Sequence, residues 1–494
     1  KPEVRIDREG LLQRLERVGP SFGSQSAPYV VQKDDKTILL YNSNHDEGES
    51  GLWKTVMEPF EKTKTEKIKD VSSMNDLEEA KGKYYLLSGG NLYKLDLDGG
   101  KAEKINVQHS FRRQLRAEFE QMYYEAWANL EENFYNETFH GVDWPAKRDQ
   151  YAAFLPYVNS RADLRQVLNE LMGELNTSHF RFTSSGKEEE VYYGSHSLST
   201  GLLFDSAEPY RVSRIVRRSP ADRSGKDVQP GDELVAVDGL ELDPAQNREA
   251  YFSRPSIDDE MALTFRRADS TFTVKFHPVD YHVIRNLLYD EWQERNQRLV
   301  DDRGDRTVAY VHMKNMGGGE LQSFLEDMVS EAHLRKGLIL DLRYNTGGNV
   351  HNDVLQFLSQ RTYLQWKYRE GALSSQPHFA PSDYPIVLLI NEQSLSDAEM
   401  TTAGFKELGL GTVIGAETYR WIIFTSGKTL VDGSFYRLPS WGCYTLDGQN
   451  LEQTGVAPDI EVRNTFLDRL NGKDPQLERA IQEVLESRKM KDKR

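Results

Sequence analysis

At 494 residues, the chain is too long for one hydrophobic core, and three or four domains are expected. Its apolar share of 38% can fill several cores, while no apolar run approaches the roughly 20 residues that a membrane span needs. The formal net charge of −16 argues against nucleic acid or an anionic membrane surface as a partner. The single cysteine, Cys443, excludes an internal disulfide and metal sites built on paired cysteines, and no His-Glu-x-x-His pattern is present, so neither metal nor cofactor is expected.

Residues 1–108 are predicted to form short β-strands, because short runs such as 84–87 are followed by glycine-containing turns and further runs. The triplets Leu52-Trp53-Lys54 and Leu92-Tyr93-Lys94 are about 40 residues apart, a spacing typical of propeller blades. Two blades cannot close a ring, so the pattern predicts a partial β-propeller whose remainder precedes this chain. A small antiparallel sheet packed on the rest explains the pattern equally well.

Residues 109–192 are predicted to form a helical core subdomain. Apolar residues recur at three- and four-residue steps from about residue 111, and again after Ser160, which forms a capping-box pattern with Asp163. The second helix runs directly into Asn176-Thr177-Ser178-His179.

Residues 193–282 form a separate unit with the order of a PDZ domain. A first apolar run is followed by 212–216, by Ser-Pro-Ala-Asp, and by Pro-Gly-Asp-Glu-Leu-Val-Ala-Val-Asp-Gly at 230–239. The resemblance implies a peptide-binding loop whose backbone amides receive a terminal carboxylate, next to a strand that adds the peptide to its sheet. The residues of that loop are Gly201, Leu202, Leu203 and Phe204.

Residues 283–494 are predicted to be an α/β domain with a largely parallel sheet. The apolar runs 308–311, 338–342 and 386–390 are each followed by a turn and a helical pattern. Functional sites of such sheets lie at the carboxyl ends of the strands. Two of these ends are therefore of interest, at 341–348 and 391–399.

Both strand ends also have an ordinary structural interpretation. The Gly347-Gly348 turn leaves backbone amides open to an anion, but a tight turn alone explains it. Ser396 stands where a helix starts, so its hydroxyl is exposed, yet an N-cap serine fits that position as well.

Four motifs occur in one order around the PDZ-like unit: 176–179, the Gly347-Gly348 turn, Ser396-Asp397, and 451–462. This order resembles the tricorn core proteases, relatives of the carboxy-terminal-processing peptidases, over about residues 111–494. The resemblance implies a serine endopeptidase that cleaves peptides or unfolded chains and forms a homo-oligomer in its full-length form.

The resemblance also implies the role of each site residue. These roles are Ser396 as nucleophile, His179 as its general base, Ser178 and Glu452 as supports of that base, and the backbone amides of Gly347 and Asp397 as the oxyanion hole. A serine hydroxyl needs a neighbouring base, an imidazole serves as base and acid near neutrality, and the oxyanion needs fixed donors. The carboxylates Asp459 and Glu461 lie close to Glu452 in sequence and remain alternatives.

One stretch, Thr418-Tyr419-Arg420-Trp421, departs from the family pattern. Trp421 stands where processing peptidases carry a catalytic lysine, so a serine–lysine dyad is disfavoured and the histidine site is favoured. The bulk of Arg420 and Trp421 predicts a narrowed or filled cleft. It also supports the alternative of a catalytically silent peptide-binding protein.

The sequence thus predicts a multidomain α/β protein: a partial β-propeller, a helical core subdomain, a PDZ-like β-domain and an α/β catalytic domain. The chain begins at Lys1 without an initiator methionine or signal peptide, which predicts a mature form or a fragment. A cytoplasmic location is expected, with an exported or periplasmic location as the alternative.

Overall fold

The computed structural model describes residues 9–10, 17–108, 110, 112–190, 194–255 and 259–491, with the side chains of the last two excepted. Contacts divide the chain into two compact units, residues 1–113 and 114–494. The predicted domain boundary at residues 192 and 193 lies outside the described residues. So does the start of the first helical pattern at residue 111.

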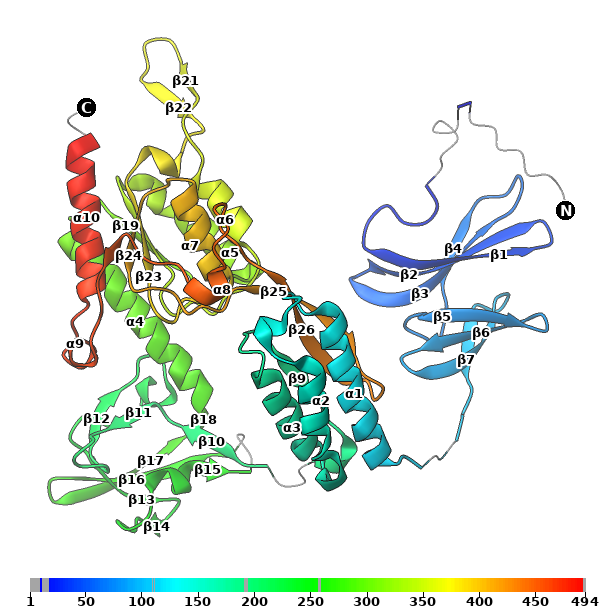
Figure 1. Ribbon diagram of the computed structural model, residues 1–494, viewed down its shortest axis with the longest axis horizontal. Coiled ribbons are helices and arrows are strands. Elements are labelled where there is room, and N and C mark those ends of the chain that lie inside the picture. The colour runs from blue at the N-terminus through cyan, green and yellow to red at the C-terminus, as the bar shows by residue number, and fades with distance from the viewer. Residues whose placement is uncertain are drawn as a thin grey trace. The chain divides into compact units, whose positions relative to one another are not determined.

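The first unit contains two four-stranded antiparallel sheets, each paired in chain order (Figure 1). The first sheet consists of β1 (Gln25–Lys33), β2 (Lys36–Asp46), β3 (Glu49–Met57) and β4 (Lys64–Lys67). The second consists of β5 (Asp76–Ala80), β6 (Lys83–Ser88), β7 (Asn91–Asp96) and β8 (Lys101–Lys104). Leu52 and Leu95 belong to one buried cluster that both sheets share, so the sheets form a single core. The two triplets noted in the sequence occupy the third strand of their respective sheets, β3 and β7.

The second unit begins with three helices, α1 (Leu115–Asn133), α2 (Trp144–Ala152) and α3 (Arg161–Gly173). The predicted capping box of α3 is present: Ser160 Oγ accepts from the Asp163 amide at 3.2 Å, and Asp163 Oδ2 accepts from the Ser160 amide at 3.0 Å. Leu164, Leu168 and Leu171 are fully buried along one stripe of α3. The helical prediction is therefore confirmed for these segments.

A strand from the far end of the chain completes the helical core. The three-stranded antiparallel sheet β25-β26-β9 combines β9 (Arg181–Thr183) with β25 (Ile423–Thr429) and β26 (Phe435–Gly442). Tyr436 on β26 pairs with Phe182 on β9 and is buried against the helices. This pairing anchors the segment that follows α3, including residues 178–179, to the C-terminal part of the chain.

Residues 196–280, within the segment predicted to be PDZ-like, carry short antiparallel strands. These are β10 (His196–Ser199), β11 (Leu202–Phe204), β12 (Val212–Ile215), β13 (Glu233–Val237), β14 (Leu240–Glu241), β15 (Ser253–Arg254), β16 (Met261–Arg267), β17 (Ser270–Phe276) and β18 (Val279–Asp280). They enclose a separate buried cluster that includes Met261, Leu263, Phe265 and Phe276. Strand β11 pairs with β12 alone in its two-stranded sheet, so one of its edges is unpaired.

The remaining residues form a five-stranded parallel sheet in the order β19-β20-β23-β24-β27, as predicted (Figure 1). Its strands are β19 (Ala309–His312), β20 (Leu338–Asp341), β23 (Ile386–Ile390), β24 (Thr412–Gly415) and β27 (Ile460–Glu461). The helices are α4 (Tyr281–Arg303), α5 (Gly318–Ser330), α6 (His351–Leu358), α7 (Asp397–Glu407), α8 (Leu451–Thr454), α9 (Phe466–Leu470) and α10 (Pro475–Lys491). Side chains of α5, α6 and α7 pack on one face of the sheet, and those of α4 and α10 pack on the other. The two helical layers exclude water from both faces, which explains why β23 is apolar throughout and β20 is apolar up to its last residue, Asp341.

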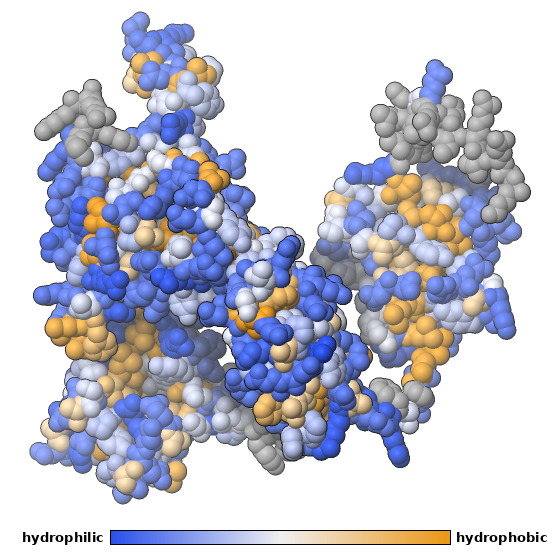
Figure 2. Space-filling view, in the orientation of Figure 1, coloured by the Kyte–Doolittle hydropathy of each residue, from blue (hydrophilic) through white to orange (hydrophobic). Residues whose placement is uncertain are grey.

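A hairpin of β21 (Leu364–Lys367) and β22 (Leu373–Gln376) projects from this domain (Figures 1 and 2). Its apolar side chains Leu364, Trp366 and Leu373 are exposed. Among the described residues, no helix combines the length and apolarity that crossing a bilayer requires.

Candidate active site

The two strand ends singled out in the sequence lie side by side in the structure. Parallel pairing of β20 with β23 brings Asp341 level with Leu389, so the turns that follow both strands meet at one edge of the sheet. Two hydrogen bonds join the turns. The Leu395 amide donates to the Asn345 carbonyl at 3.1 Å, and Ser394 Oγ donates to the Leu342 carbonyl at 2.8 Å.

Ser396 occupies the tip of the turn between β23 and α7 in a strained backbone conformation. Its φ of 57° and ψ of −116° are rare for a residue with a side chain, and such conformations cluster at functional sites. Its backbone amide donates to Glu399 Oε2 at 2.9 Å, so Ser396 contributes to the start of α7 through its backbone. The hydroxyl bonds to His179 and makes no capping bond, although the residue occupies the N-cap position.

His179 reaches Ser396 from the segment between α3 and β9. Its Nε2 lies 3.1 Å from Ser396 Oγ, and its Nδ1 lies 2.7 Å from Ser178 Oγ. The histidine is buried and has a positive φ of 63°. Pairing of the following strand β9 with β26 supplies the long-range support for this position.

Glu452, at the start of α8, fixes the direction of the hydrogen bonds. Its Oε1 accepts from the Ser178 amide at 2.7 Å, and its Oε2 accepts from Ser178 Oγ at 3.0 Å and from the Ile422 amide at 2.9 Å. Because the Ser178 hydroxyl proton points to the carboxylate, its oxygen accepts from His179 Nδ1–H. His179 Nε2 is then left without a proton and can accept the proton of Ser396.

The alternatives to Glu452 are bound elsewhere. Asp459 accepts from the Val413 amide at 2.8 Å and pairs with Lys406 at 2.9 Å, while Glu461 pairs with Arg463 on the surface. Of the three carboxylates, only Glu452 contacts the serine–histidine pair.

The surroundings keep His179 neutral. Burial and, to a smaller extent, the positive charge of Arg437 together lower the pKa of His179 to about 4. A neutral imidazole at neutral pH is the form that can remove a proton from a serine hydroxyl.

The expected oxyanion hole requires a correction at one glycine. The Gly347 amide donates to Asn345 Oδ1 at 2.9 Å, so it is already engaged. The next residue, Gly348, lines the cavity at Ser396, and no described acceptor bonds its amide. The Asp397 amide, at the first position of α7, likewise has no described acceptor. The Gly347 amide, which the sequence predicted to bind the oxyanion, donates to the Asn345 side chain instead. The glycine pair in the sequence does not indicate this hydrogen bond.

Hydrogen bonds of the Asp397 side chain join the two turns that carry these amides. Asp397 Oδ2 accepts from the amides of Val350 and His351 at 2.7 and 3.0 Å, and Asp397 Oδ1 lies 2.5 Å from His351 Nδ1. The Asp397 carboxylate raises the pKa of His351, which favours an ionic bond between them. Asp397 is thereby hydrogen-bonded to the start of α6, just after the Gly347-Gly348 turn. Sequence reasoning missed His351, and no local pattern marks it.

Glu399 connects the backbone of Ser396 to the loop at residues 418–421 through hydrogen bonds. This buried carboxylate accepts from the amides of Ser396, Arg420 and Trp421 at 2.8 to 2.9 Å and from Thr418 Oγ1 at 2.6 Å. Burial nevertheless raises its pKa. Sequence reasoning gave it no role, although the Ser-x-x-Glu spacing at 396–399 is a capping-box signal that could have identified it.

Arg420 and Trp421 lie beside Ser178 and Glu452, and they do not line the cavity that contains Ser396. They line a cavity of about 770 Å³ together with Ser178 and Glu452. The Trp421 ring packs against His179 with centroids 5.6 Å apart, and Arg420 pairs with Glu417. A smaller cavity of about 250 Å³ contains Ser396 and is lined by neither residue. The predicted filling of the cleft is therefore not seen at Ser396.

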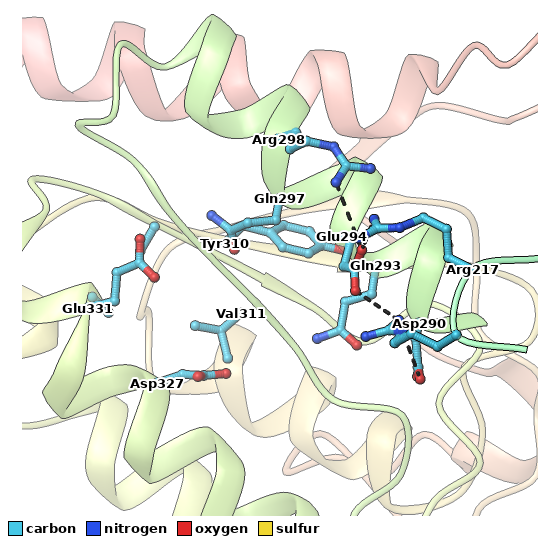
Figure 3. A pocket seen from close by; sticks show the side chains of 13 residues that line it. Arg217, Asp290, Gln293, Glu294, Gln297, Arg298, Tyr310, Val311, Asp327 and Glu331 are labelled. Atoms are coloured by element: carbon cyan, nitrogen blue, oxygen red, sulfur yellow. Dashed lines mark hydrogen bonds and ion pairs between the residues drawn. The ribbon is translucent and has the colours of Figure 1, made fainter. Parts of the chain in front are cut away.

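Two further cavities lie outside this cluster. One of about 620 Å³ in the PDZ-like unit is lined by Leu202, Leu203 and Phe204, beside the unpaired edge of β11, whereas Gly201 turns the chain at φ 88° and does not line it. The other, of about 610 Å³, runs along α4 and β19 (Figure 3). There Glu294 pairs with nearby arginines, which are Arg217 and Arg218 at 2.8 Å and Arg298 at 3.9 Å.

A serine bonded to a buried histidine, with free amides at the adjoining turns, is the arrangement of a serine peptidase site. Residues 307–462 match peptidase family S41, and residues 115–173 match the tricorn protease C1 domain. The chain belongs to the tricorn protease family of S41 serine peptidases, which is related to the C-terminal processing proteases.

Individual relatives agree with this assignment. The chain is 27% identical over 443 residues to the tricorn protease of Thermoplasma acidophilum, covering 86% of this chain and 40% of that protein. It is 29% identical over 388 residues to tricorn protease homolog 1 of Streptomyces coelicolor, covering 74% of this chain and 35% of that protein. The crystal structure of the tricorn protease superposes with a TM-score of 0.72 at 22% identity, covering 93% of this chain and 46% of that chain, and shows a shared fold. The chain thus spans less than half the length of these relatives.

Proposed function

We propose that this chain hydrolyses peptide bonds through an acyl-enzyme on Ser396. The observation that carries the proposal is the continuous relay from Glu452 through Ser178 to His179 and on to Ser396 Oγ, with links of 3.0, 2.7 and 3.1 Å. The donation from Ser178 Oγ to the Glu452 carboxylate favours the tautomer with Nε2 unprotonated, which general-base catalysis requires.

The proposed reaction uses only groups of this chain. His179 Nε2 takes the Ser396 proton as Oγ attacks the scissile carbonyl carbon, and the tetrahedral oxyanion accepts from the amides of Gly348 and Asp397. The imidazolium then gives its proton to the leaving amine, and the C–N bond breaks. A water molecule, deprotonated by the same imidazole, releases the acyl group and restores Ser396. Each oxyanion donor is worth about 10²- to 10³-fold in rate.

The proposed domain roles follow the same reasoning. Residues 109–192 supply the base, residues 283–494 supply the nucleophile, and residues 193–282 are a PDZ-like domain whose β11 edge, with the loop at 201–204, binds a peptide. Residues 1–108 are two blades of a partial propeller, since two four-stranded antiparallel sheets follow each other in chain order. We propose peptides or unfolded chains as substrates and a homo-oligomer for the full-length form, to be measured by light scattering.

A fluorophosphonate probe tests the function directly. We expect stoichiometric labelling of the chain at Ser396, identified by peptide mass mapping, and no labelling of Ser396→Ala. The control for a general effect of losing a hydroxyl is the half-buried Ser440→Ala, whose Oγ lies 2.6 Å from Ser426 Oγ. Thermal unfolding verifies that this variant is folded. An unlabelled but folded chain contradicts the proposal and favours the silent peptide-binding alternative.

A further inference from the structure

The cavity that contains Ser396 also contains an arginine. Arg437, on β26, lines this space of about 250 Å³ together with the apolar side chains of Met400, Ile422 and Phe424. The cavity is also lined by Asn349, Thr425 and Asp397, and the Asp397 carboxylate is already bound by His351 and the Val350 amide. A group that fills the cavity therefore meets apolar side chains, several polar groups and one cationic end.

Arg437 has no anionic partner in the part of the chain that the structure describes. Its Nε donates to Thr425 Oγ1 at 2.8 Å, and no ion pair to it is formed by any described carboxylate. Its cross-strand neighbour on β9 is a second cation, Arg181. Burial, and then the charge of Arg181, lower the pKa of Arg437. A guanidinium has five N–H donors in a fixed fork, so most of its donors remain available.

The buried arginines elsewhere in the described part of this unit are paired with carboxylates. Arg343 is bound by Asp341 and Asp474 at 2.7 Å each, and Arg161 is paired with Glu188 and Asp432. Even the exposed arginines of the cavity in Figure 3 pair with Glu294. Arg437 departs from this pattern, because it is partly buried and no described carboxylate pairs with it. Desolvation of an uncompensated charge is unfavourable, so a ligand that supplies the missing negative charge would be stabilised there. A carboxylate is the ligand that matches the guanidinium fork in shape and charge.

We propose that Arg437 selects substrates with a carboxylate on a residue next to the scissile bond. The inference rests on the proposed function and names its substrate class. An aspartate or glutamate side chain is one source of that carboxylate, and the terminus of a short peptide is the other. The apolar walls strengthen the pairing by excluding water, and the same cation repels lysine or arginine at that subsite.

The position of Arg437 also couples binding to catalysis. Its charge is one of the two causes that lower the pKa of His179. A bound carboxylate offsets that charge and makes the imidazole a stronger base when an acidic substrate is present. We therefore expect the preference for substrates with a carboxylate to raise kcat as well as to lower KM.

Peptide series that differ at one residue test the proposal. We suggest fluorophore-labelled, C-terminally amidated peptides in which one position carries Glu, Gln, Lys or Leu, and a second series in which Gln peptides of decreasing length end in a free carboxylate. The expected kcat/KM for Glu exceeds that for Gln by at least about 10-fold, as for a charge-assisted pair. A preference in the amidated series identifies the side chain as the source, and one confined to the free-acid series identifies the terminus.

The variant Arg437→Gln is expected to bring the Glu-to-Gln ratio close to one while Ser396 is still labelled by the fluorophosphonate. The matched control is Arg181→Gln, which removes the same charge from the exposed neighbour on β9 and should keep most of the preference. If both variants lose the preference for Glu equally, the preference comes from the overall positive charge of this region, and the assignment to Arg437 is overturned. A Glu-to-Gln ratio near one in the unaltered chain, in both series, overturns the proposal itself.

Binding gives a readout that does not require turnover. The same peptides are titrated by fluorescence anisotropy into Ser396→Ala and into Ser396→Ala combined with Arg437→Gln. Tighter binding of the carboxylate peptides, lost in the double variant, supports the selective role even for a chain that does not react with fluorophosphonate. Equal affinity of Glu and Gln peptides, together with normal labelling of Ser396, refutes the inference and leaves the proposed function standing.

Discussion

The substitution Glu452→Gln tests whether the relay sets the proton positions. An amide matches the carboxylate in shape, but one of its two ends is a donor. Glu452 accepts at both ends, from the Ser178 amide at Oε1 and from Ser178 Oγ and the Ile422 amide at Oε2. Neither orientation of the amide therefore preserves all three hydrogen bonds.

The size of the effect follows from the two orientations. With the NH₂ group at the Oε2 position, the Ser178 hydroxyl must donate to His179 Nδ1, and the imidazole proton moves to Nε2, where it faces Ser396. With the NH₂ group at the Oε1 position, the Ser178 amide loses its acceptor, and the imidazolium loses its counter-charge in either case. A wrong tautomer lowers kcat by about 10⁴-fold in a directly bonded triad. With a serine interposed, we expect about 10²- to 10⁴-fold, or about 3–5 kcal/mol at 1.36 kcal/mol per factor of ten.

The assay is the second-order rate of fluorophosphonate labelling at Ser396, followed by intact mass at several probe concentrations. Thermal unfolding verifies that the variant is folded. The control Glu461→Gln removes the same charge from the surface, where Glu461 contacts Arg463, and should label at the unaltered rate. A folded Glu452→Gln chain that labels within about twofold of the unaltered rate would falsify the relay.

Three further results are expected. The labelling rate should rise from low pH with a midpoint near 4 and be level at neutral pH, because burial and Arg437 lower the pKa of His179 to about 4; a midpoint at 6.5 or above would contradict this environment. The linkage has the matching sign: the folded chain loses stability as pH falls from about 6.5 toward 4, since the unfolded imidazole takes up the proton first. Gly348→Ala should lower labelling at least about 100-fold, because its Cβ would lie 2.0 Å from the Met316 carbonyl oxygen. Gly319→Ala, with open space around it, should label at the unaltered rate, and comparable labelling of the two variants would refute the packing of this turn. Arg343→Met should cost about 3–5 kcal/mol of unfolding free energy in denaturant titration, because it leaves Asp341 and Asp474 buried without their cation, and a loss below 1 kcal/mol would show that the cluster is not coupled.

Periodicity predicted the secondary structure well where the sequence repeats a simple pattern. The stripe of Leu164, Leu168 and Leu171 and the apolar run 386–390 indicated α3 and β23, and both elements are present. The pairing of β9 with β26 was not predicted, because the two strands are separated by more than half of the chain. No local pattern encodes a partner at that distance.

The order of the motifs singled out Ser396, His179, Ser178 and Glu452, and the structure brings these four side chains together. Tertiary structure alone decided which backbone amides remain free and which charges remain unpaired. Asn345 accepts from the Gly347 amide, and no carboxylate among the described residues pairs with Arg437. Hydrogen bonds and ion pairs depend on distances of a few ångströms, which the sequence does not specify. Residue type and order indicate which groups are capable of chemistry, while only folding determines which of them are already satisfied.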